Sequence, residues 1–271
     1  MSSEPTPREI ENWFPGKWSE VIGNTVLVLK LMDFILNGTC NMMATGIGRT
    51  GKTRTLHLGI RSLLCTQRSP NLDPCGQCYA CNESVDPKNS HWGGFRALSG
   101  SEYEYFAVDC ENITKAELED LKKNSRLYTE KTIVYLDEVA ALRRRGLEGT
   151  LLKTIDESDA TWFATAIKLK REREAKKKGW TVHLSQDILN RFALKVGTSV
   201  PHTDDLRLWI EERCLEWNLK IEEPDETIPL MMKRTNKIVG HVIKMLALAA
   251  SNRNRTLTLQ DVRKFNLDAL D

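Results

Sequence analysis

The segment "GIGRTGKT", Gly46 to Thr53, matches the phosphate-binding pattern G-x-x-x-x-G-K-[ST] in full. The apolar run "CNMMATG" before it predicts a strand, and "TRTLHLGIRSLLC" after it predicts a helix. Such a loop directs backbone N–H groups at a phosphate, at the positive end of a helix. Lys52 is expected to reach the β- and γ-phosphates of a nucleotide, and the Thr53 hydroxyl to bind Mg²⁺. The alternative is a chance match in a glycine-rich turn. The expected nucleotide contacts in this region are Gly46, Gly48, Thr50, Gly51, Lys52, Thr53 and Arg54.

A second motif, "TIVYLDEV", is an apolar strand that ends in Asp137 and Glu138, 85 residues after Lys52. Ligand sites in open α/β sheets lie at the carboxyl ends of the strands, where both carboxylates would then stand. Asp137 is expected to hold Mg²⁺ through water, and Glu138 to polarise an attacking water as general base. This pair favours hydrolysis of a nucleotide over binding alone.

Four cysteines follow the spacing Cys65-x9-Cys75-x2-Cys78-x2-Cys81. Four thiolates suit tetrahedral Zn²⁺, and C-x-x-C knuckles are the usual way to present them. A closed four-sulfur site is expected to be structural. Disulfides or an empty site are the alternatives, and a redox role is disfavoured by three cysteines in one Pro/Gly-containing loop.

The order of the elements predicts an α/β fold with a parallel sheet, followed by a helical lid. Strands alternate with helices over residues 13–198, and residues 199–271 read as helices only. Residues 1–12 are expected to be a flexible tail, and residues 85–104 to be irregular.

The 271 residues contain no basic-then-apolar leader and no apolar run of membrane-spanning length, so we expect a cytoplasmic protein with no membrane partner.

These motifs together resemble the AAA+ ATPases, and within them the clamp-loader branch typified by the bacterial DNA polymerase III gamma/tau subunit. "FPGKWSEVIGN" is similar to the N-terminal box of that branch, and "VYLDEVAALRRRGLEGTLLKTIDES" to its second motif and next helix. The cysteine segment, residues 65–81, resembles its zinc module. The resemblance covers residues 13–166. It implies ATP, Mg²⁺ and Zn²⁺ as cofactors, and Phe14, Pro15 and Ile22 as contacts of the adenine.

The resemblance also implies two further catalytic residues. Thr165 stands where the family senses the γ-phosphate, and Arg191 where it places an arginine finger that reaches the ATP of a neighbouring subunit. The finger role requires an oligomer, and the alternative for Arg191 is an ordinary surface arginine. The chain departs from the family at "NRF", Asn190 to Phe192, and at Val239–Gly240, where a lid arginine is usual.

Two basic stretches predict contact with duplex DNA through its phosphates. One is the triplet after the second motif, and the other lies within "KLKREREAKKK", which carries a net charge of +5. The alternative for the longer stretch is a solvated, salt-bridged helix. The expected DNA contacts are Arg143, Arg144, Arg145, Lys168, Lys170, Arg171, Lys176, Lys177 and Lys178.

Three functional hypotheses remain open. The first is a collarless, clamp-loader-like ATPase that assembles on duplex DNA under the control of ATP and meets a sliding clamp or a polymerase. We expect it to lack a collar because the sequence stops at Asp271. The second is a transposition regulator that polymerises on DNA and recruits a transposase, because "NRF" and "KIVGHVIKMLALAA" are similar to transposon-encoded AAA+ proteins. The third is a non-hydrolysing ATP-binding interaction module.

Overall fold

The computed structural model describes residues 4–265 except 39, 90–94, 100–102, 171–179 and 183. Four of the expected DNA contacts, Arg171, Lys176, Lys177 and Lys178, lie outside the described residues. For Lys168 and Lys170 the backbone alone is described.

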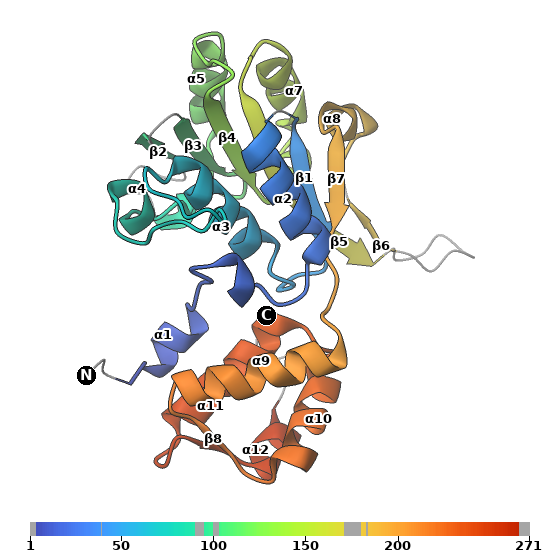
Figure 1. The fold of residues 1–271 in the computed structure, drawn as a ribbon. Helices are drawn as coiled ribbons and strands as arrows, with labels where there is room; N and C mark the ends of the chain where they lie inside the picture. The colour runs from blue at the N-terminus through green and yellow to red at the C-terminus, as the bar shows by residue number, and fades with distance from the viewer. Residues whose placement is uncertain are drawn as a thin grey trace.

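A largely parallel sheet forms the centre of the larger part of the molecule (Figure 1). Its strand order is β2-β3-β4-β5-β1-β7. β3, β4, β5, β1 and β7 are parallel, β2 is antiparallel to β3, and β6 is antiparallel to the end of β5. The bounds in chain order are β1 Met42–Gly46, β2 Phe95–Ser99, β3 Glu104–Asp109, β4 Thr132–Asp137, β5 Thr161–Lys170, β6 Trp180–Val182 and β7 Leu194–Gly197.

Helices cover both faces of this sheet, as the continuous apolar strands require. α2 (Thr25–Asn37) and α3 (Lys52–Leu64) pack on one face, and α5 (Lys115–Ser125), α7 (Glu148–Asp156) and α8 (Gln186–Arg191) on the other. Successive strand residues alternate between the two cores, so that Tyr135 faces α3 while Val134 and Leu136 face the opposite core. α6 (Ala140–Arg144) follows β4 directly. We call residues 13–198 the sheet unit.

Two expectations about local structure are wrong. Residues 95–99, within the segment expected to be irregular, form β2. An edge strand needs backbone hydrogen bonds on one side only, and a five-residue pattern is hidden by its Gly- and Ser-rich flanks. Residues 168–170 and 180–182 pair as strands β5 and β6, so the helical alternative fails for these described ends of the basic stretch.

The C-terminal helices surround a separate core, and we call residues 203–264 the helical unit. It contains α9 (Thr203–Glu216), β8 (Lys220–Ile221), α10 (Pro224–Arg234), α11 (Val239–Ser251), β9 (Thr256–Leu257) and α12 (Leu259–Lys264). Trp209, Met231 and Leu246 lie in its core, and β8 and β9 form a short parallel pair. Its role as a lid stays a prediction.

The N-terminal residues are ordered on the helical unit, so the expectation of a flexible tail is wrong for residues 7–11. These residues form α1 (Pro7–Glu11), which begins with a reciprocal capping box between Thr6 and Glu9. Ile10 is 1% exposed within the helical core, and the Trp13 ring meets those of Trp209 and Trp217 edge to face. Burial of these apolar side chains explains why a mostly polar segment is fixed.

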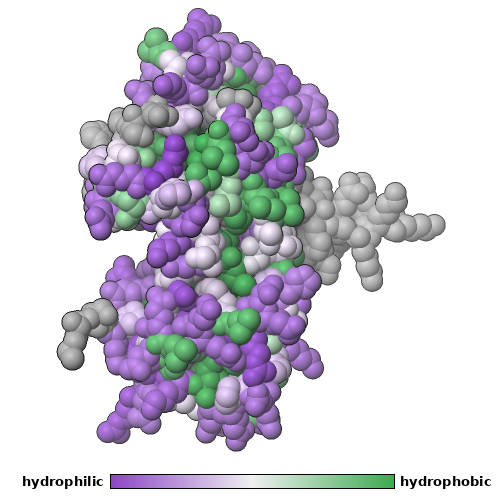
Figure 2. All heavy atoms as spheres, viewed as in Figure 1, coloured by the Kyte–Doolittle hydropathy of each residue, from purple (hydrophilic) through white to green (hydrophobic). Residues whose placement is uncertain are grey.

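The molecular surface is mainly polar, with hydrophobic residues gathered near α2 (Figure 2). Val26, Leu29 and Leu36 of this helix are all at least 60% exposed. Among the described residues, every helix is too short or too polar to cross a membrane.

The phosphate-binding loop touches the helical unit at the start of α11. The Gly240 N–H donates to the Arg49 carbonyl over 3.1 Å. A Cβ at position 240 would lie 2.8 Å from the Arg49 Cβ and 3.0 Å from its carbonyl oxygen. Gly240 stands at a position where the resemblance predicts a lid arginine. Its contact with the loop leaves no room for a larger side chain there.

We predict that Gly240→Ala destabilises the protein by about 1–3 kcal/mol, because backbone on both sides must shift to admit the methyl group. Gly149→Ala is the matched control, since a Cβ there meets nothing within 4 Å in α7. The control should be neutral or stabilising by up to about 1 kcal/mol. Denaturant unfolding measures both, and equal stability of the two variants would contradict the steric argument.

Candidate active site and candidate metal centre

The phosphate-binding loop connects β1 to α3 and is held by its own hydroxyl groups. The Thr50 Oγ1 lies 2.8 Å from the Ile47 carbonyl oxygen and 2.7 Å from the Thr198 Oγ1. Gly51 has φ +87°, and a Cβ on Gly46 would lie 1.9 Å from the Thr198 Oγ1. Glycine is therefore required at positions 46 and 51 for different reasons, backbone conformation at 51 and close packing at 46.

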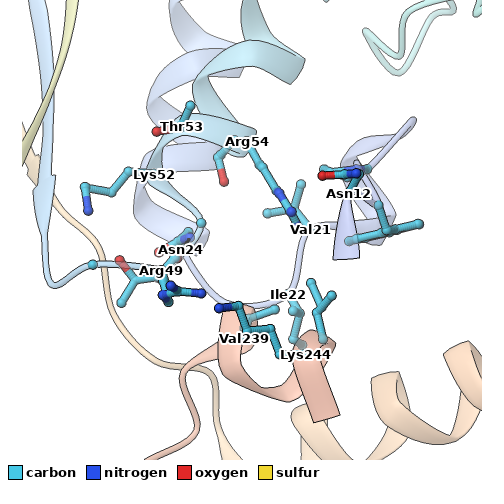
Figure 3. A pocket seen from close by; sticks show the side chains of 18 of the residues that line it. Asn12, Val21, Ile22, Asn24, Arg49, Lys52, Thr53, Arg54, Val239 and Lys244 are labelled. Atoms are coloured by element: carbon cyan, nitrogen blue, oxygen red, sulfur yellow. Dashed lines mark hydrogen bonds between the residues drawn. The ribbon is translucent and has the colours of Figure 1, made fainter. Parts of the chain in front are cut away.

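A cavity of about 390 Å³ opens beside this loop, between the sheet unit and the helical unit (Figure 3). We call it the interunit cavity. This volume lies within the range of small-molecule sites. The lining comes from the loop, the segment 11–24, the end of β4 and the start of α11. The expected nucleotide contacts that line it are Pro15, Ile22, Gly48, Thr50, Gly51, Lys52, Thr53 and Arg54.

Phe14 is not among the residues that line the cavity, and its expected contact with the adenine stays a prediction. Its ring stacks on His57 with centroids 6.2 Å apart, and the Arg61 guanidinium lies 4.5 Å from its centroid. Two side chains of α3 thus hold the ring against the sheet unit. Gly46 lies at the end of β1, beneath the loop.

The Lys52 ammonium is folded back onto the loop. It donates to the carbonyl oxygens of Gly46 and Ile47 over 3.2 and 2.8 Å. Burial lowers the pKa of Lys52, and the charges of Glu138 and Asp137 oppose this shift. The side chain would leave these two carbonyls to reach a phosphate.

Asp137 is 3% exposed, and its carboxylate collects hydroxyl groups from three elements. Its Oδ1 accepts from Tyr135 Oη at 2.7 Å and Thr165 Oγ1 at 3.0 Å, and Thr53 Oγ1 lies 3.5 Å away. Burial alone would raise the pKa of Asp137, but the Lys88 ammonium and the two hydroxyls outweigh it and lower the pKa. A hydroxyl and a carboxylate side by side are the oxygen ligands that Mg²⁺ prefers, so Thr53 and Asp137 fit this ion.

Thr165 connects the Asp137 carboxylate to the backbone of Glu138. Its hydroxyl donates to Asp137 and accepts from the Glu138 N–H over 2.9 Å. Glu138 has φ +52°, and its Oε2 accepts from the Ile167 N–H over 3.1 Å. Burial raises the pKa of Glu138, although Lys52 opposes the shift. The structure thus places Lys52, Thr53, Asp137, Glu138 and Thr165 at one edge of the sheet.

Asn24 is a functional candidate that the sequence analysis missed. Its Nδ2 donates to the Thr50 carbonyl over 2.7 Å, and its Oδ1 accepts from the Ser199 N–H over 3.3 Å. This side chain is 3% exposed and joins the loop to the connection between the two units. Its signal in the sequence, an Asn after Gly in a turn, is too common to identify it.

Arg191 lies at the opposite edge of the sheet from the interunit cavity. Its carbonyl accepts from the side chain of Asn41, which precedes β1. Its Nε and Nη2 both bind the Asp156 carboxylate over 2.8 Å. An arginine in this place cannot serve the cavity of its own chain, so its expected role in a neighbouring site stays a prediction.

The basic triplet is exposed at the end of α6, near the edge of the sheet at which the strand β4 ends. It consists of Arg143, Arg144 and Arg145. Arg144 Nη2 lies 3.9 Å from the Glu111 carboxylate, and Arg145 donates to the Cys110 carbonyl over 3.1 Å. Their contact with DNA stays a prediction.

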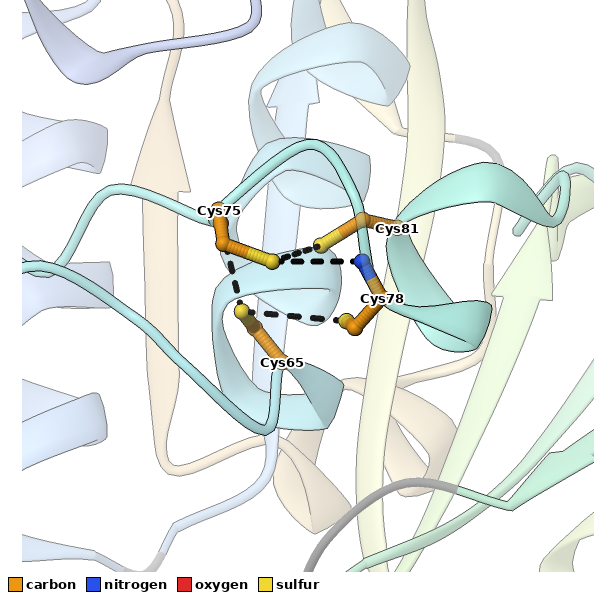
Figure 4. Close-up of side chains that lie close together, drawn as sticks. All are labelled: Cys65, Cys75, Cys78 and Cys81. Atoms are coloured by element: carbon orange, nitrogen blue, oxygen red, sulfur yellow. Dashed lines mark hydrogen bonds between the residues drawn. The ribbon is translucent and has the colours of Figure 1, made fainter.

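The four cysteines meet as the spacing predicts (Figure 4). Their Sγ atoms all lie within 4.8 Å of one another, with Cys75–Cys81 and Cys65–Cys78 at 3.9 Å. Sulfurs in a tetrahedral Zn²⁺ site stand about 3.8 Å apart, given Zn–S bonds of about 2.3 Å, whereas a disulfide needs about 2.05 Å. In the part of the chain that the structure describes, the cysteines are free thiols. The cluster therefore fits Zn²⁺.

The cysteine segment is attached to elements that carry the nucleotide site. Trp18 donates its backbone N–H to Asp73 over 2.8 Å and its indole N–H to the Leu72 carbonyl over 3.0 Å. Ser62 of α3 donates to the same carbonyl. The cluster thus supports the segment that leads into the cavity lining at Glu20 and Val21.

We predict one Zn²⁺ per chain. Cys78→Ala should lose this stoichiometry in metal analysis and lower the thermal midpoint, because three thiolates hold the ion less tightly. Cys40→Ala is the control, because Cys40 stands outside the cluster. Equal zinc content in both variants would contradict the assignment.

His57 is buried between the rings of Phe14 and Tyr135. Burial lowers its pKa from 6.5 to about 4. The folded protein therefore binds fewer protons than the unfolded chain between these values, and its stability falls as the pH falls through this window. The contribution of His57 to the free energy of unfolding is present above pH 6.5 and is lost as the pH falls toward 4. It amounts to about 3 kcal/mol, at about 1.4 kcal/mol per pKa unit.

We predict that His57→Phe flattens the dependence of unfolding free energy on pH between 6.5 and 4. Denaturant unfolding at several pH values measures the slope. His202→Phe, which removes an exposed imidazole at the start of α9, is the matched control. A slope that survives in the His57 variant would show that another group is responsible.

Comparison with solved structures shows the fold of this chain. The RuvB Holliday junction branch migration motor of Thermotoga maritima matches with a TM-score of 0.55 and 15% identity, covering 92% of this chain and 70% of that one. Another RuvB structure from that organism gives 0.58 at 15%, covering 93% and 72%. PCH-2 of C. elegans gives 0.52 at 14%, covering 90% and 68%. No family model and no curated protein matches. At these identities the likeness concerns the fold alone: the chain shares the fold of these RuvB and PCH-2 structures.

Proposed function

We propose that this chain is an ATP-hydrolysing AAA+ protein that assembles with further AAA+ subunits on duplex DNA. The observation that carries the proposal is that Lys52, Thr53 and Glu138 line the interunit cavity, with the Asp137 carboxylate 3.5 Å behind the Thr53 hydroxyl. The loop would bind the phosphates of ATP through its N–H groups and Lys52. Mg²⁺ held at Thr53 and Asp137 would neutralise charge on the phosphates.

Glu138 would act on the attacking water. Its carboxylate is held by the Ile167 N–H at the cavity edge, and its raised pKa brings it closer to the operating range of a general base. Thr165 would hold the Asp137 carboxylate and the backbone of Glu138 in place. Arg191 would reach the ATP of a neighbouring subunit, which explains why it lies far from its own cavity.

Two machines remain candidates. The cysteine cluster supports the clamp-loader-like interpretation, with a sliding clamp or a polymerase as partner. "NRF" and the lid sequence "KIVGHVIKMLALAA" support the regulator that polymerises on DNA and recruits a transposase. DNA contact would use the exposed triplet of α6 and the basic stretch that β5 and β6 flank.

We predict that Glu138→Gln lowers ATP turnover by at least about 100-fold, because the amide cannot take a proton from water. Nucleotide affinity should be retained, since the phosphate contacts remain. Lys52→Ala is the contrasting variant and should lose both. Turnover of the wild type should fall at acid pH as Glu138 becomes protonated, at a higher pH than for an ordinary glutamate.

The same variant tests assembly. With ATP and duplex DNA, the Glu138→Gln protein should form stable particles on the DNA, and high salt should dissociate them from it. Pentamers that bind a sliding clamp would support the first machine, and continuous filaments or rings without clamp affinity the second. Unchanged turnover in Glu138→Gln would overturn the hydrolytic assignment, and wild-type turnover too low to measure would favour the interaction module.

A further inference from the structure

The residues that follow the cysteine segment place a cation at the edge of the site. Lys88 stands seven residues after Cys81, in the short turn η2 (Pro87–Asn89). Its ammonium lies 3.1 Å from Oδ2 of Asp137, the oxygen that none of the hydroxyl groups described above contacts. No motif in the sequence points to a role for this lysine.

The turn that carries Lys88 is held on its N-terminal side. The Val85 carbonyl accepts from the buried Tyr105 hydroxyl over 2.7 Å, and the Lys88 N–H donates to Asp86 over 2.9 Å. α4 (Tyr79–Asn82), which carries Cys81, precedes this turn in the chain. The backbone that leads to Lys88 is therefore attached to β3, which contains Tyr105, and follows closely on the cysteine cluster.

The neighbouring carboxylates leave Asp137 as the main partner of this cation. Asp109, which pairs with Asp137 in the strand register, is bonded to the Glu111 N–H and the Asn112 side chain at 3.0 and 2.7 Å. Glu111 lies 3.9 Å from the ammonium and also faces Arg144. The short contact is the one to Asp137.

This contact conflicts with a divalent cation. Lys88 and Mg²⁺ would draw on the same carboxylate, and two cations a few ångströms apart repel strongly near a buried site. The Lys88 side chain is 46% exposed, whereas that of Asp137 is 4% exposed. The lysine can therefore swing toward solvent and Glu111, while the aspartate cannot move.

We propose that Lys88 guards the metal position: its ammonium pairs with Asp137 in the nucleotide-free protein and must be displaced for Mg²⁺ to bind. Lys88 is thus a positioning residue that sets the Mg²⁺ concentration at which the site loads. Because Lys88 follows the last cysteine of the cluster by only seven residues, loss of the zinc cluster would also change the Mg²⁺ requirement. The inference rests on the proposed function for the identity of the site.

The test is a Mg²⁺ titration of fluorescent ADP binding to the full chain. Lys88→Met should lower the Mg²⁺ midpoint about tenfold, and Lys88→Gln should do the same. Lys88→Arg keeps the cation and should stay within about twofold of the wild type. Lys30→Met, on the exposed side of α2, is the matched control and should not shift the midpoint.

A second readout needs no nucleotide. Mn²⁺ alone, followed by electron paramagnetic resonance, should bind the nucleotide-free Lys88→Met protein more tightly than the wild type. The gain should disappear in Lys88→Met/Asp137→Asn. An unchanged or raised Mg²⁺ midpoint in both neutral variants, or unchanged Mn²⁺ affinity, would overturn the inference. Failure of every variant to bind nucleotide, with the Mn²⁺ gain intact, would instead sink the proposed function.

Discussion

The buried carboxylate of Asp137 is the interaction on which the site depends. A charge in this position is tolerated because both of its oxygens are bonded, one to the hydroxyls of Tyr135 and Thr165 and the other to the Lys88 ammonium. Each partner comes from a different strand or turn, so the edge of the sheet is tied together at one point. The same hydroxyl of Thr165 accepts from the Glu138 N–H, so it would link the proposed metal ligand to the proposed general base.

The positions of the main site residues could be predicted from the sequence because local patterns specify them. A glycine-containing loop between a strand and a helix predicts a phosphate site, and an apolar strand that ends in Asp137 and Glu138 predicts its carboxylates. The parallel register then brings Asp137 and Thr165 to the end of β1, as the structure shows. The spacing of the cysteines also predicts the cluster from a local pattern, because three of the four cysteines lie in one short loop.

The features that could not be predicted depend on contacts between distant segments. α1 is fixed by Ile10 in a core formed some two hundred residues later, and Phe14 is drawn to α3. Asn24 and Gly240 have ordinary neighbours in sequence, and their roles appear only where the two units meet the loop. Lys88 is similar: nothing near it in the sequence indicates that its turn ends beside β4.

The ion pair of Arg191 with Asp156 bears on how subunits would assemble. Its guanidinium is satisfied within its own chain by Asp156, so it is not held ready for a phosphate. Yet both side chains are substantially exposed, at 34% and 46%, and surface ion pairs contribute little stability because water and salt screen them. Under the proposed function, the triphosphate of a neighbouring subunit would carry more negative charge than one carboxylate, and it would replace Asp156 at small cost. Assembly would then free Asp156 and bring Arg191 to the triphosphate in one step. The binding partner of the arginine would then come from the neighbouring subunit and no longer from its own chain.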